Sequence, residues 1–285
     1  MEAQTVAEAA AEVARRLAEA GVENPRLEAE ILVRTAAGIS HERLHAHPEL
    51  VLSPNARDSL AALTARRARR EPLPYVLGEV EFYSLTFRVT PAALVPRPET
   101  EILVEEAVRR AREFDARLLL DVGAGSGAIA VVLARELPGA RVLAVDVSLE
   151  ALRLTRENAA RHGVADRVLL ANGDLLSALD VEADAIVANL PYVESGVLSS
   201  LQPEVRDFEP RGALDGGYDG LEVVRRFTAQ LPCHVSQHGF AALEVGAGQA
   251  GEVARLLASE GLRRIETVRD YAGIERVVIG RREGA

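Results

Sequence analysis

From residue 117 onward the chain alternates between short apolar runs and amphipathic segments, and this alternation restricts its fold more than any other feature. Strands are predicted at 117–122, 141–147, 167–172, 184–189, 239–245, 263–269 and 275–280, and helices at 127–137, 149–162, 221–230 and 250–260. Such alternation indicates a mostly parallel sheet with helices on both faces. The last two strands are joined by a few residues around Gly273, too few for a crossover, so the final strand must be antiparallel. We therefore predict an α/β fold with a doubly wound, seven-stranded, mostly parallel sheet whose last strand is antiparallel.

The N-terminal part of the chain follows a helical pattern, because its apolar residues recur at intervals of three and four between capping signals. Thr5 with Glu8 forms a capping box, and Asn24-Pro25 and Ser53-Pro54 each place a cap before a first-turn proline. Further on, the apolar period changes to alternation, which predicts a hairpin over 79–95 that bridges two domains. We predict a small helical bundle at 1–75, a linker with a β-hairpin at 76–97, and a domain built on the alternating strands and helices at 98–285.

Composition and charge exclude several classes of protein. The single cysteine, Cys233, cannot form an internal disulfide, which fits a reducing cytoplasm, and we expect a cytoplasmic location. No stretch approaches the length of a membrane span, and no signal-peptide pattern begins the sequence. The net charge of -10 argues against tight general binding to nucleic acid. His41, His45 and His47 lie close in sequence without an acid or cysteine partner, so no metal site is expected.

The tetrapeptide Asn189-Leu190-Pro191-Tyr192 directly follows an apolar run that we predict to be a buried parallel strand. Open α/β sheets bind ligands at the carboxyl ends of their strands. The Asn189 side chain and the Leu190 carbonyl, which the following proline restrains, can accept two hydrogen bonds from one planar NH2 group. The Tyr192 ring can cover the flat face of that group, although it also fits a packing role. We predict that these four residues form a catalytic pocket for an amide or an exocyclic amine.

A glycine-rich turn after the first predicted strand points to a nucleotide. Its glycines let the backbone approach a ligand, and Asp146 ends the next strand, where an acid can bind both hydroxyls of a ribose. Asp146 also fits a helix cap before Ser148. Asp174 could accept a hydrogen bond from an adenine amine, with Leu175 against the ring. The two residues fit a turn equally well. The predicted nucleotide site comprises Gly123, Ala124, Gly125, Ser126, Gly127, Asp146, Asp174, Leu175 and Asn189.

A second glycine-rich loop, at 246–251, matches the dinucleotide-binding fingerprint with Asp270 as its acid, and it would support an NAD-dependent dehydrogenase. Asp270, however, precedes the tight connection to the antiparallel strand, with no βαβ unit around it. We interpret this loop as a turn. The arginine cluster at 66–70 is interpreted as a solvated helix face, with a docking patch as the alternative.

Taken together, these residues resemble those of class I S-adenosylmethionine-dependent methyltransferases, and further motifs are similar to those of the release-factor glutamine methyltransferases. These motifs are Pro96-Arg97-Pro98-Glu99-Thr100-Glu101, Gly125-Ser126-Gly127-Ala128-Ile129-Ala130, Glu209-Pro210, Ala213-Leu214-Asp215-Gly216-Gly217, Gly220-Leu221 and Asp270-Tyr271-Ala272-Gly273-Ile274-Glu275-Arg276. The resemblance implies methyl transfer from S-adenosylmethionine to the side-chain amide nitrogen (N5) of the glutamine in the Gly-Gly-Gln motif of class 1 peptide chain release factors, with S-adenosylhomocysteine as product.

The same resemblance implies that the predicted nucleotide site holds the cofactor and that Asn189 touches both cofactor and substrate. Leu190 stands where the family usually has proline, and it retains the backbone carbonyl that acts there. The resemblance also implies that the helical bundle at 1–75 recognises the substrate and that residues 98–285 form the catalytic domain. We expect a monomer whose partner is a release factor, with no direct nucleic-acid or membrane partner.

Two alternatives remain for the pocket. An adenine-N6 DNA methyltransferase would use a similar pocket on a flipped base, but the acidic charge and the lack of a recognisable DNA-reading module argue against it. The non-enzymatic alternative is a methyltransferase fold that has lost catalysis and acts as a binding module, and Leu190 is the residue that favours it.

Overall fold

The computed structural model describes residues 4–283, and the chain divides into two compact units. One unit comprises residues 1–78 together with 202–208, and the other comprises residues 79–201 and 209–285. The chain therefore leaves the second unit after Leu201 and returns to it at Glu209. No change in the sequence pattern marks this excursion.

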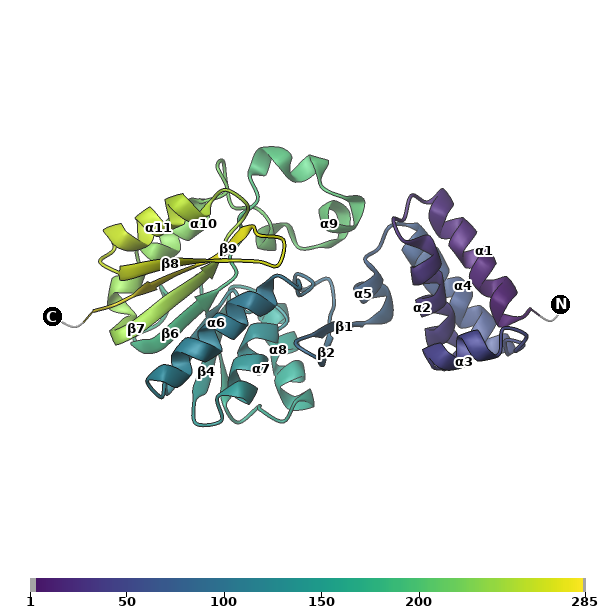
Figure 1. Cartoon of the computed structure of the whole chain (residues 1–285), viewed down its shortest axis with the longest axis horizontal. Helices are drawn as coiled ribbons and strands as arrows, with labels where there is room; N and C mark the ends of the chain where they lie inside the picture. The colour runs from purple at the N-terminus through teal and green to yellow at the C-terminus, as the bar shows by residue number, and fades with distance from the viewer. Residues whose placement is uncertain (1–3, 284–285) are drawn as a thin grey trace. The chain divides into compact units, whose positions relative to one another are not determined.

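Within its described residues, the first unit contains five N-terminal helices around an apolar core of their own (Figure 1). They are α1 (Val6–Glu19), α2 (Pro25–Ala37), α3 (His41–Ala46), α4 (Pro54–Ala68) and α5 (Leu73–Leu77). The capping box predicted at Thr5 is present, and Ser53 caps α4 by accepting from the Ala56 amide. Asn24 occupies the N-cap position of α2, but its side chain makes no capping bond, so that prediction is wrong. The backbone of Asn24 lies outside the extended region that aims a cap side chain at the helix amides.

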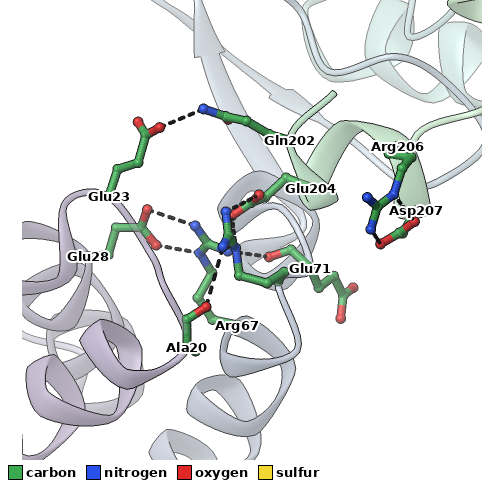
Figure 2. A network of polar contacts seen from close by, with 10 residues as sticks. Ala20, Glu23, Glu28, Arg67, Glu71, Gln202, Glu204, Arg206 and Asp207 are labelled. Atoms are coloured by element: carbon green, nitrogen blue, oxygen red, sulfur yellow. Dashed lines mark hydrogen bonds and ion pairs between the residues drawn. The ribbon is translucent and has the colours of Figure 1, made fainter. Parts of the chain in front are cut away.

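An ion-pair network joins segment 202–208 to the helices of its own unit (Figure 2). Within this segment, α9 (Pro203–Phe208) carries Glu204, which accepts hydrogen bonds from Arg67 (2.9 Å) and from Arg70 (2.6 and 2.7 Å). Arg67 also pairs with Glu28 of α2, and only 5% of its side chain is exposed. The interpretation of this arginine cluster as a solvated face is therefore wrong, because acids from α2 and α9 bury its inner members.

We expect Glu204→Gln to lower the free energy of unfolding by about 1.5–3 kcal/mol, because two guanidinium groups lose charge-assisted hydrogen bonds. Burial raises the pKa of Glu204, but the bonds from Arg70 and Arg67 outweigh it and hold the pKa below its ordinary value of 4.5. A carboxylate with a lowered pKa stabilises the fold above its unfolded pKa, and this contribution is lost as the pH falls through the folded pKa. The difference between the proteins should thus be full at neutral pH and vanish in acid.

Urea unfolding followed by circular dichroism at several pH values measures this effect. Arg15→Ala is a suitable control, because Arg15 and Glu19 form an exposed pair on α1 and its loss should change stability by no more than about 0.5 kcal/mol. Equal effects of the two substitutions would contradict a structural role for Glu204.

The second unit is built on the predicted seven-stranded sheet, with strand order β5-β4-β3-β6-β7-β9-β8. Strands β3 to β7 run parallel, whereas β9 is antiparallel to both of its neighbours, which confirms the predicted fold class. The strands are β3 (Leu118–Val122), β4 (Arg141–Asp146), β5 (Val168–Asn172), β6 (Ala183–Ala188), β7 (Val235–Glu244), β8 (Arg263–Arg269) and β9 (Glu275–Arg281). Only β7 starts well before its predicted position, because the polar residues 236–238 interrupt its apolar pattern.

Helices cover both faces of this sheet and enclose one apolar core on each (Figure 1). On one face lie α6 (Thr100–Glu113), α7 (Ala128–Glu136) and α8 (Leu149–Arg161), and on the other α10 (Glu222–Thr228) and α11 (Ala250–Ser259). The short helices η1 (Ser195–Ser200), η2 (Arg211–Ala213) and η3 (Leu231–Cys233) lie in the connections. Because β3 to β7 are parallel, their carboxyl ends meet at one edge of the sheet, which is where the predicted site residues lie.

The predicted hairpin is shorter than expected. It consists of β1 (Glu79–Phe82) and β2 (Leu85–Arg88), and the residues from 89 to 99 have no regular structure. Tyr83 and Ser84 form its tight turn with positive φ angles. Among residues 4–283, no helix combines the length and the apolar character that a membrane span requires.

Candidate active site

A cavity of about 400 Å³ opens at the carboxyl ends of the parallel strands and contains most of the predicted site residues. Those that line it are Gly123, Ala124, Gly125, Ser126, Asp146, Asp174, Leu175, Asn189, Leu190 and Pro191. Gly127 and Tyr192 do not line it. The residues predicted to hold a nucleotide and those predicted to hold an NH2 group therefore share one cavity.

The glycine-rich turn is held in a conformation that only glycine adopts readily. Gly123, Gly125 and Gly127 all have positive φ angles. A Cβ on Gly127 would lie 2.6 Å from the Thr155 side chain and 2.9 Å from its Cα, because α8 packs directly against the turn. Gly127 is the N-cap of α7, and this explains why it shapes the turn without lining the cavity.

Asp146 holds the turn and lines the cavity at the same time. Its Oδ2 accepts from the Gly125 amide (2.8 Å) and its Oδ1 from the Ser148 amide (2.8 Å). The helix cap considered as an alternative for Asp146 is wrong, because Ser148 itself is the N-cap of α8 and accepts from the Ala151 amide. Each carboxylate oxygen of Asp146 can accept more than one hydrogen bond, which leaves capacity for the hydroxyls of a ribose.

Asp174 and Leu175 form a turn that borders the cavity. The Ser177 amide donates to the Asp174 carbonyl (3.2 Å), and Leu175 has a φ of 56°. The Asp174 carboxylate pairs with Arg226, which lines the same cavity. A ligand amine at this point would meet a carboxylate that already has a cationic partner.

Asn189 lies within a buried chain of hydrogen bonds that the sequence pattern did not indicate. Its Nδ2 donates to Thr100 Oγ1 (3.1 Å), and Thr100 Oγ1 donates to Glu244 Oε2 (2.6 Å). Glu244 ends β7 and is 2% exposed. Burial raises the pKa of Glu244 to about 7, against the opposing effects of the Thr100 hydrogen bond and the Arg276 charge. The signal that could have indicated Glu244 is an acid at the carboxyl end of an apolar parallel strand.

Tyr192 is half-buried next to Glu244. Burial, and next the Glu244 charge, raise the pKa of Tyr192 to about 12. The phenol therefore stays neutral at ordinary pH, which excludes a tyrosinate acting as a base.

The backbone around Tyr192 is fixed by the segment that carries the motifs at 213–217 and 220–221. The Val193 amide donates to the Leu214 carbonyl (3.0 Å), and the Gly216 amide donates back to the Val193 carbonyl (2.8 Å). Gly220 has a φ of 73°, and a Cβ there would lie 2.4 Å from the Tyr192 carbonyl oxygen. These glycines allow two backbone segments to approach more closely than side chains would permit.

The second glycine-rich loop supports the same tetrapeptide. Gln249 donates through Nε2 to the Tyr192 carbonyl (3.0 Å) and accepts through Oε1 from the Gly246 amide (2.9 Å). The backbone N–H of Gln249 donates to the Gly246 carbonyl, which forms a turn. No residue from 246 to 251 lines the cavity. The loop is therefore a turn, as interpreted, and the dehydrogenase alternative loses its basis.

The motifs at 96–101 and 209–210 meet in an ion pair beside the cavity. Arg97 Nη2 lies 2.5 Å from Glu209 Oε2, and the Glu209 side chain is 1% exposed. Burial raises the pKa of Glu209, while Arg97 opposes this effect. Arg97 and Pro210 both line the cavity, so this pair fixes part of its wall.

The histidines of α3 have an acid partner that the sequence did not reveal. Glu30 Oε2 lies 3.4 Å from His45 Nε2, and the His41 and His45 rings lie edge to face at 4.5 Å. Their ligand atoms lie within 4.8 Å of one another. The inference that no acid accompanies these histidines is therefore wrong, because Glu30 comes from α2. None of the three lines the cavity.

Comparison with known proteins links this arrangement to one family. Residues 8–78 match the family model described as PrmC N-terminal domain, and residues 98–202 match that of the Methyltransferase small domain. The release factor glutamine methyltransferase of Geobacter sulfurreducens is 46% identical, covering 93% of this chain and 92% of that protein. The protein of the same name from Moorella thermoacetica is 44% identical, covering 98% and 99%. The crystal structure of ribosomal protein L11 methylase from Lactobacillus delbrueckii is 23% identical, with a TM-score of 0.52 over 69% of this chain and 86% of that one, and it shares the fold.

Proposed function

Because this chain belongs to the family of release factor glutamine methyltransferases, we propose that it transfers a methyl group from S-adenosylmethionine to the side-chain amide nitrogen of a glutamine in peptide chain release factors. The glutamine is that of the Gly-Gly-Gln motif in class 1 release factors. The observation that carries this proposal is the single cavity that joins the Asn189-Leu190-Pro191 backbone and amide to the glycine-rich turn and Asp146.

The cofactor fits the groups that line this cavity. Gly123 and Gly125 line the cavity with backbone alone, and Asp146 has free acceptor capacity for ribose hydroxyls. Val147 is an apolar side chain that lines the cavity and is 73% exposed, which suits the face of an adenine ring. S-adenosylmethionine, when bound, supplies an electrophilic methyl group on a positively charged sulfur.

The residues at the other end of the cavity position the nucleophile. An amide nitrogen is a weak nucleophile, and correct placement can supply several kcal/mol of the barrier. Asn189 Oδ1 and the Leu190 carbonyl accept the two hydrogens of the glutamine amide, which aims its nitrogen at the methyl carbon. Tyr192 flanks the cavity without lining it, so we assign its ring no contact with the amide face. As the nitrogen–carbon bond forms and the carbon–sulfur bond breaks, the surplus proton leaves the nitrogen for water.

Leu190, at the position where the family usually has proline, also has a fixed backbone. Its side chain is 3% exposed and belongs to the core on the α10–α11 face, so packing fixes the backbone at this position. The carbonyl that accepts from the substrate is retained.

Replacing Asp146 with alanine should weaken S-adenosylmethionine binding by about 10- to 100-fold, equal to a loss of about 1.5–3 kcal/mol. The variant loses the ribose acceptor and also the support of the Gly125 amide. Isothermal titration calorimetry measures the dissociation constant, with Asp166→Ala as an exposed control that should bind normally. Unchanged affinity in the Asp146 variant would remove Asp146 from the cofactor site.

The remaining assignments follow from this activity. The helical domain at 1–75 recognises the release factor, the segment at 76–97 comprises the linker and the hairpin, and residues 98–285 form the catalytic domain except for the segment 202–208, which belongs to the helical unit. The enzyme acts as a monomer in the cytoplasm, where release factors work, and it binds no nucleic acid directly.

Labelled S-adenosylmethionine tests the function directly. A purified class 1 release factor, a Gly-Gly-Ala version of it and duplex DNA are each incubated with the enzyme. We expect label on the Gln form alone. Label on DNA would establish the adenine alternative, and cofactor binding without any label would establish a fold that has lost its chemistry.

A further inference from the structure

The side-chain amide of Asn189 has two ends, and only one of them can serve the reaction. The proposed function needs Oδ1 toward the substrate, since an acceptor must meet the glutamine NH2 group. If Nδ2 faced the substrate instead, two donors would oppose each other. Some group behind Asn189 must therefore determine which way its amide points.

Thr100 and Glu244 determine the orientation of the Asn189 amide, because the Thr100 hydroxyl lies between them and has a single hydrogen. A threonine hydroxyl has one hydrogen to donate. At 2.6 Å, the Thr100 hydroxyl gives this hydrogen to Glu244 Oε2, because an ionised carboxylate can only accept. Toward Asn189 the hydroxyl can then only accept, so it receives Nδ2 (3.1 Å). The Asn189 side chain also hydrogen-bonds to Glu244 directly, and an ionised carboxylate can only accept, so this contact too takes Nδ2. Oδ1 is left for the opposite side, where Asn189 lines the cavity.

Glu244 is buried, and charged groups from several elements surround its carboxylate. The charged and titratable groups that face it are Arg276 of β9, Glu99 just ahead of α6, and Tyr192 after β6. Arg276 is itself held by Asp270, whose Oδ2 accepts from Nε at 2.9 Å. The closing motif of the sequence thus supplies the cation that favours the ionised form of Glu244. Burial favours the neutral form and leaves the two forms close in energy near neutral pH.

We propose that Thr100 and Glu244 are positioning residues for the methyl transfer, and that the negative charge of Glu244 sets the orientation of the Asn189 amide. This inference rests on the proposed function for its role in catalysis. When Glu244 is protonated it can donate to Thr100, which frees the Thr100 hydroxyl to donate to Asn189 Oδ1. The amide then turns by half a revolution and presents Nδ2 to the substrate.

The kinetic test compares three substitutions. Thr100→Val keeps the shape and removes the hydroxyl, Glu244→Gln keeps the shape and removes the charge, and Thr100→Ser keeps the hydroxyl. We expect the first two to lower kcat on the release factor by about 10- to 100-fold, with KM and cofactor affinity within about twofold, and the serine variant to remain within about threefold of wild type. Thr64→Val is a matched control, because Thr64 is buried in the helical unit and its hydroxyl has no hydrogen-bond partner among residues 4–283. Wild-type kcat in Thr100→Val, or an equal loss in Thr100→Ser, would overturn the proposal.

The pH dependence supplies a readout that a purely structural role would not change. Wild-type kcat should fall as the pH drops through about 7, because Glu244 becomes protonated there, and the Glu244→Gln variant should show no such step. A step of the same size in both proteins would assign the titration to another group.

A second measurement needs no release factor. The side-chain amide signals of Asn189 in NMR spectra, assigned from the Asn189→Ala variant, should shift with a midpoint near 7 in the wild type and stay constant in Glu244→Gln. Signals that do not respond to pH in the wild type would overturn the orientation switch. If the signals respond while the wild type fails to label a release factor, the proposed substrate is wrong and the positioning of Asn189 stands.

Discussion

Asn189→Ala should reduce kcat for release-factor methylation by about 100- to 1000-fold, with a smaller change in KM. In the proposed mechanism the substitution removes the acceptor that holds one hydrogen of the glutamine amide, so the nitrogen is no longer aimed at the methyl carbon. Since the proposed substrate is a whole protein, we expect contacts outside the cavity to keep it bound. The lost interaction therefore belongs mainly to the transition state.

Steady-state and single-turnover measurements with a purified release factor separate these effects. Gln237→Ala is a suitable control, since Gln237 is an exposed residue of β7 and does not line the cavity. Cofactor affinity should be measured in parallel, because Asn189 also borders the cofactor end of the cavity. A variant with normal kcat and a raised KM would show that Asn189 only binds the substrate.

Gly220→Ala should abolish most activity, by about 100-fold or more, while the protein remains folded. The added Cβ would lie 2.4 Å from the Tyr192 carbonyl oxygen, and the φ of 73° disfavours any residue with a side chain. The contact can be relieved only by moving backbone, which displaces the tetrapeptide that we propose holds the substrate amide. A misplacement of about 1 Å is enough for a loss of this size.

Gly196→Ala is the matched control for this experiment. Gly196 lies in the same long connection after β6, and its added Cβ would meet no atom within 4 Å from the described residues outside its own local backbone. Circular dichroism should show folded protein for both variants, and only the Gly220 variant should lose methylation. Near-normal activity in the Gly220 variant would mean that the approach of this loop to Tyr192 is dispensable.

The sequence predicted correctly those elements whose structure depends on residues close together in the chain. The strands of the sheet could be predicted because buried parallel strands are continuous apolar runs, and the polar end of one such run identified Asn189-Leu190-Pro191-Tyr192. The turn at Gly123 to Gly127 could be predicted in the same way, because closely spaced glycines between a strand and a helix are typical of a sharp turn with positive φ angles. Of these residues, Gly127 and Tyr192 proved to shape or flank the cavity instead of lining it.

What the sequence could not provide were partners from distant parts of the chain. Glu244 lies 144 residues from Thr100, and neither residue type signals the other. The burial of Arg67 depends in the same way on Glu204 from α9. The local run of arginines alone therefore predicted a solvent-exposed helix face. The missing cap at Asn24 has a different cause, since backbone conformation decides whether a suitable side chain reaches the helix amides.

Because residues 202–208 belong to the helical unit, the two units cannot be exchanged between proteins by a single junction in the chain. The helical unit resembles an N-terminal module in the sequence, yet a short piece of it is encoded far downstream, between two stretches of the catalytic unit. A chimera that exchanges residues 1–78 alone would confront native Glu204 with foreign neighbours in place of Arg67 and Arg70. A functional graft must therefore transplant both pieces together, and natural recombination at the apparent boundary should seldom yield a working hybrid.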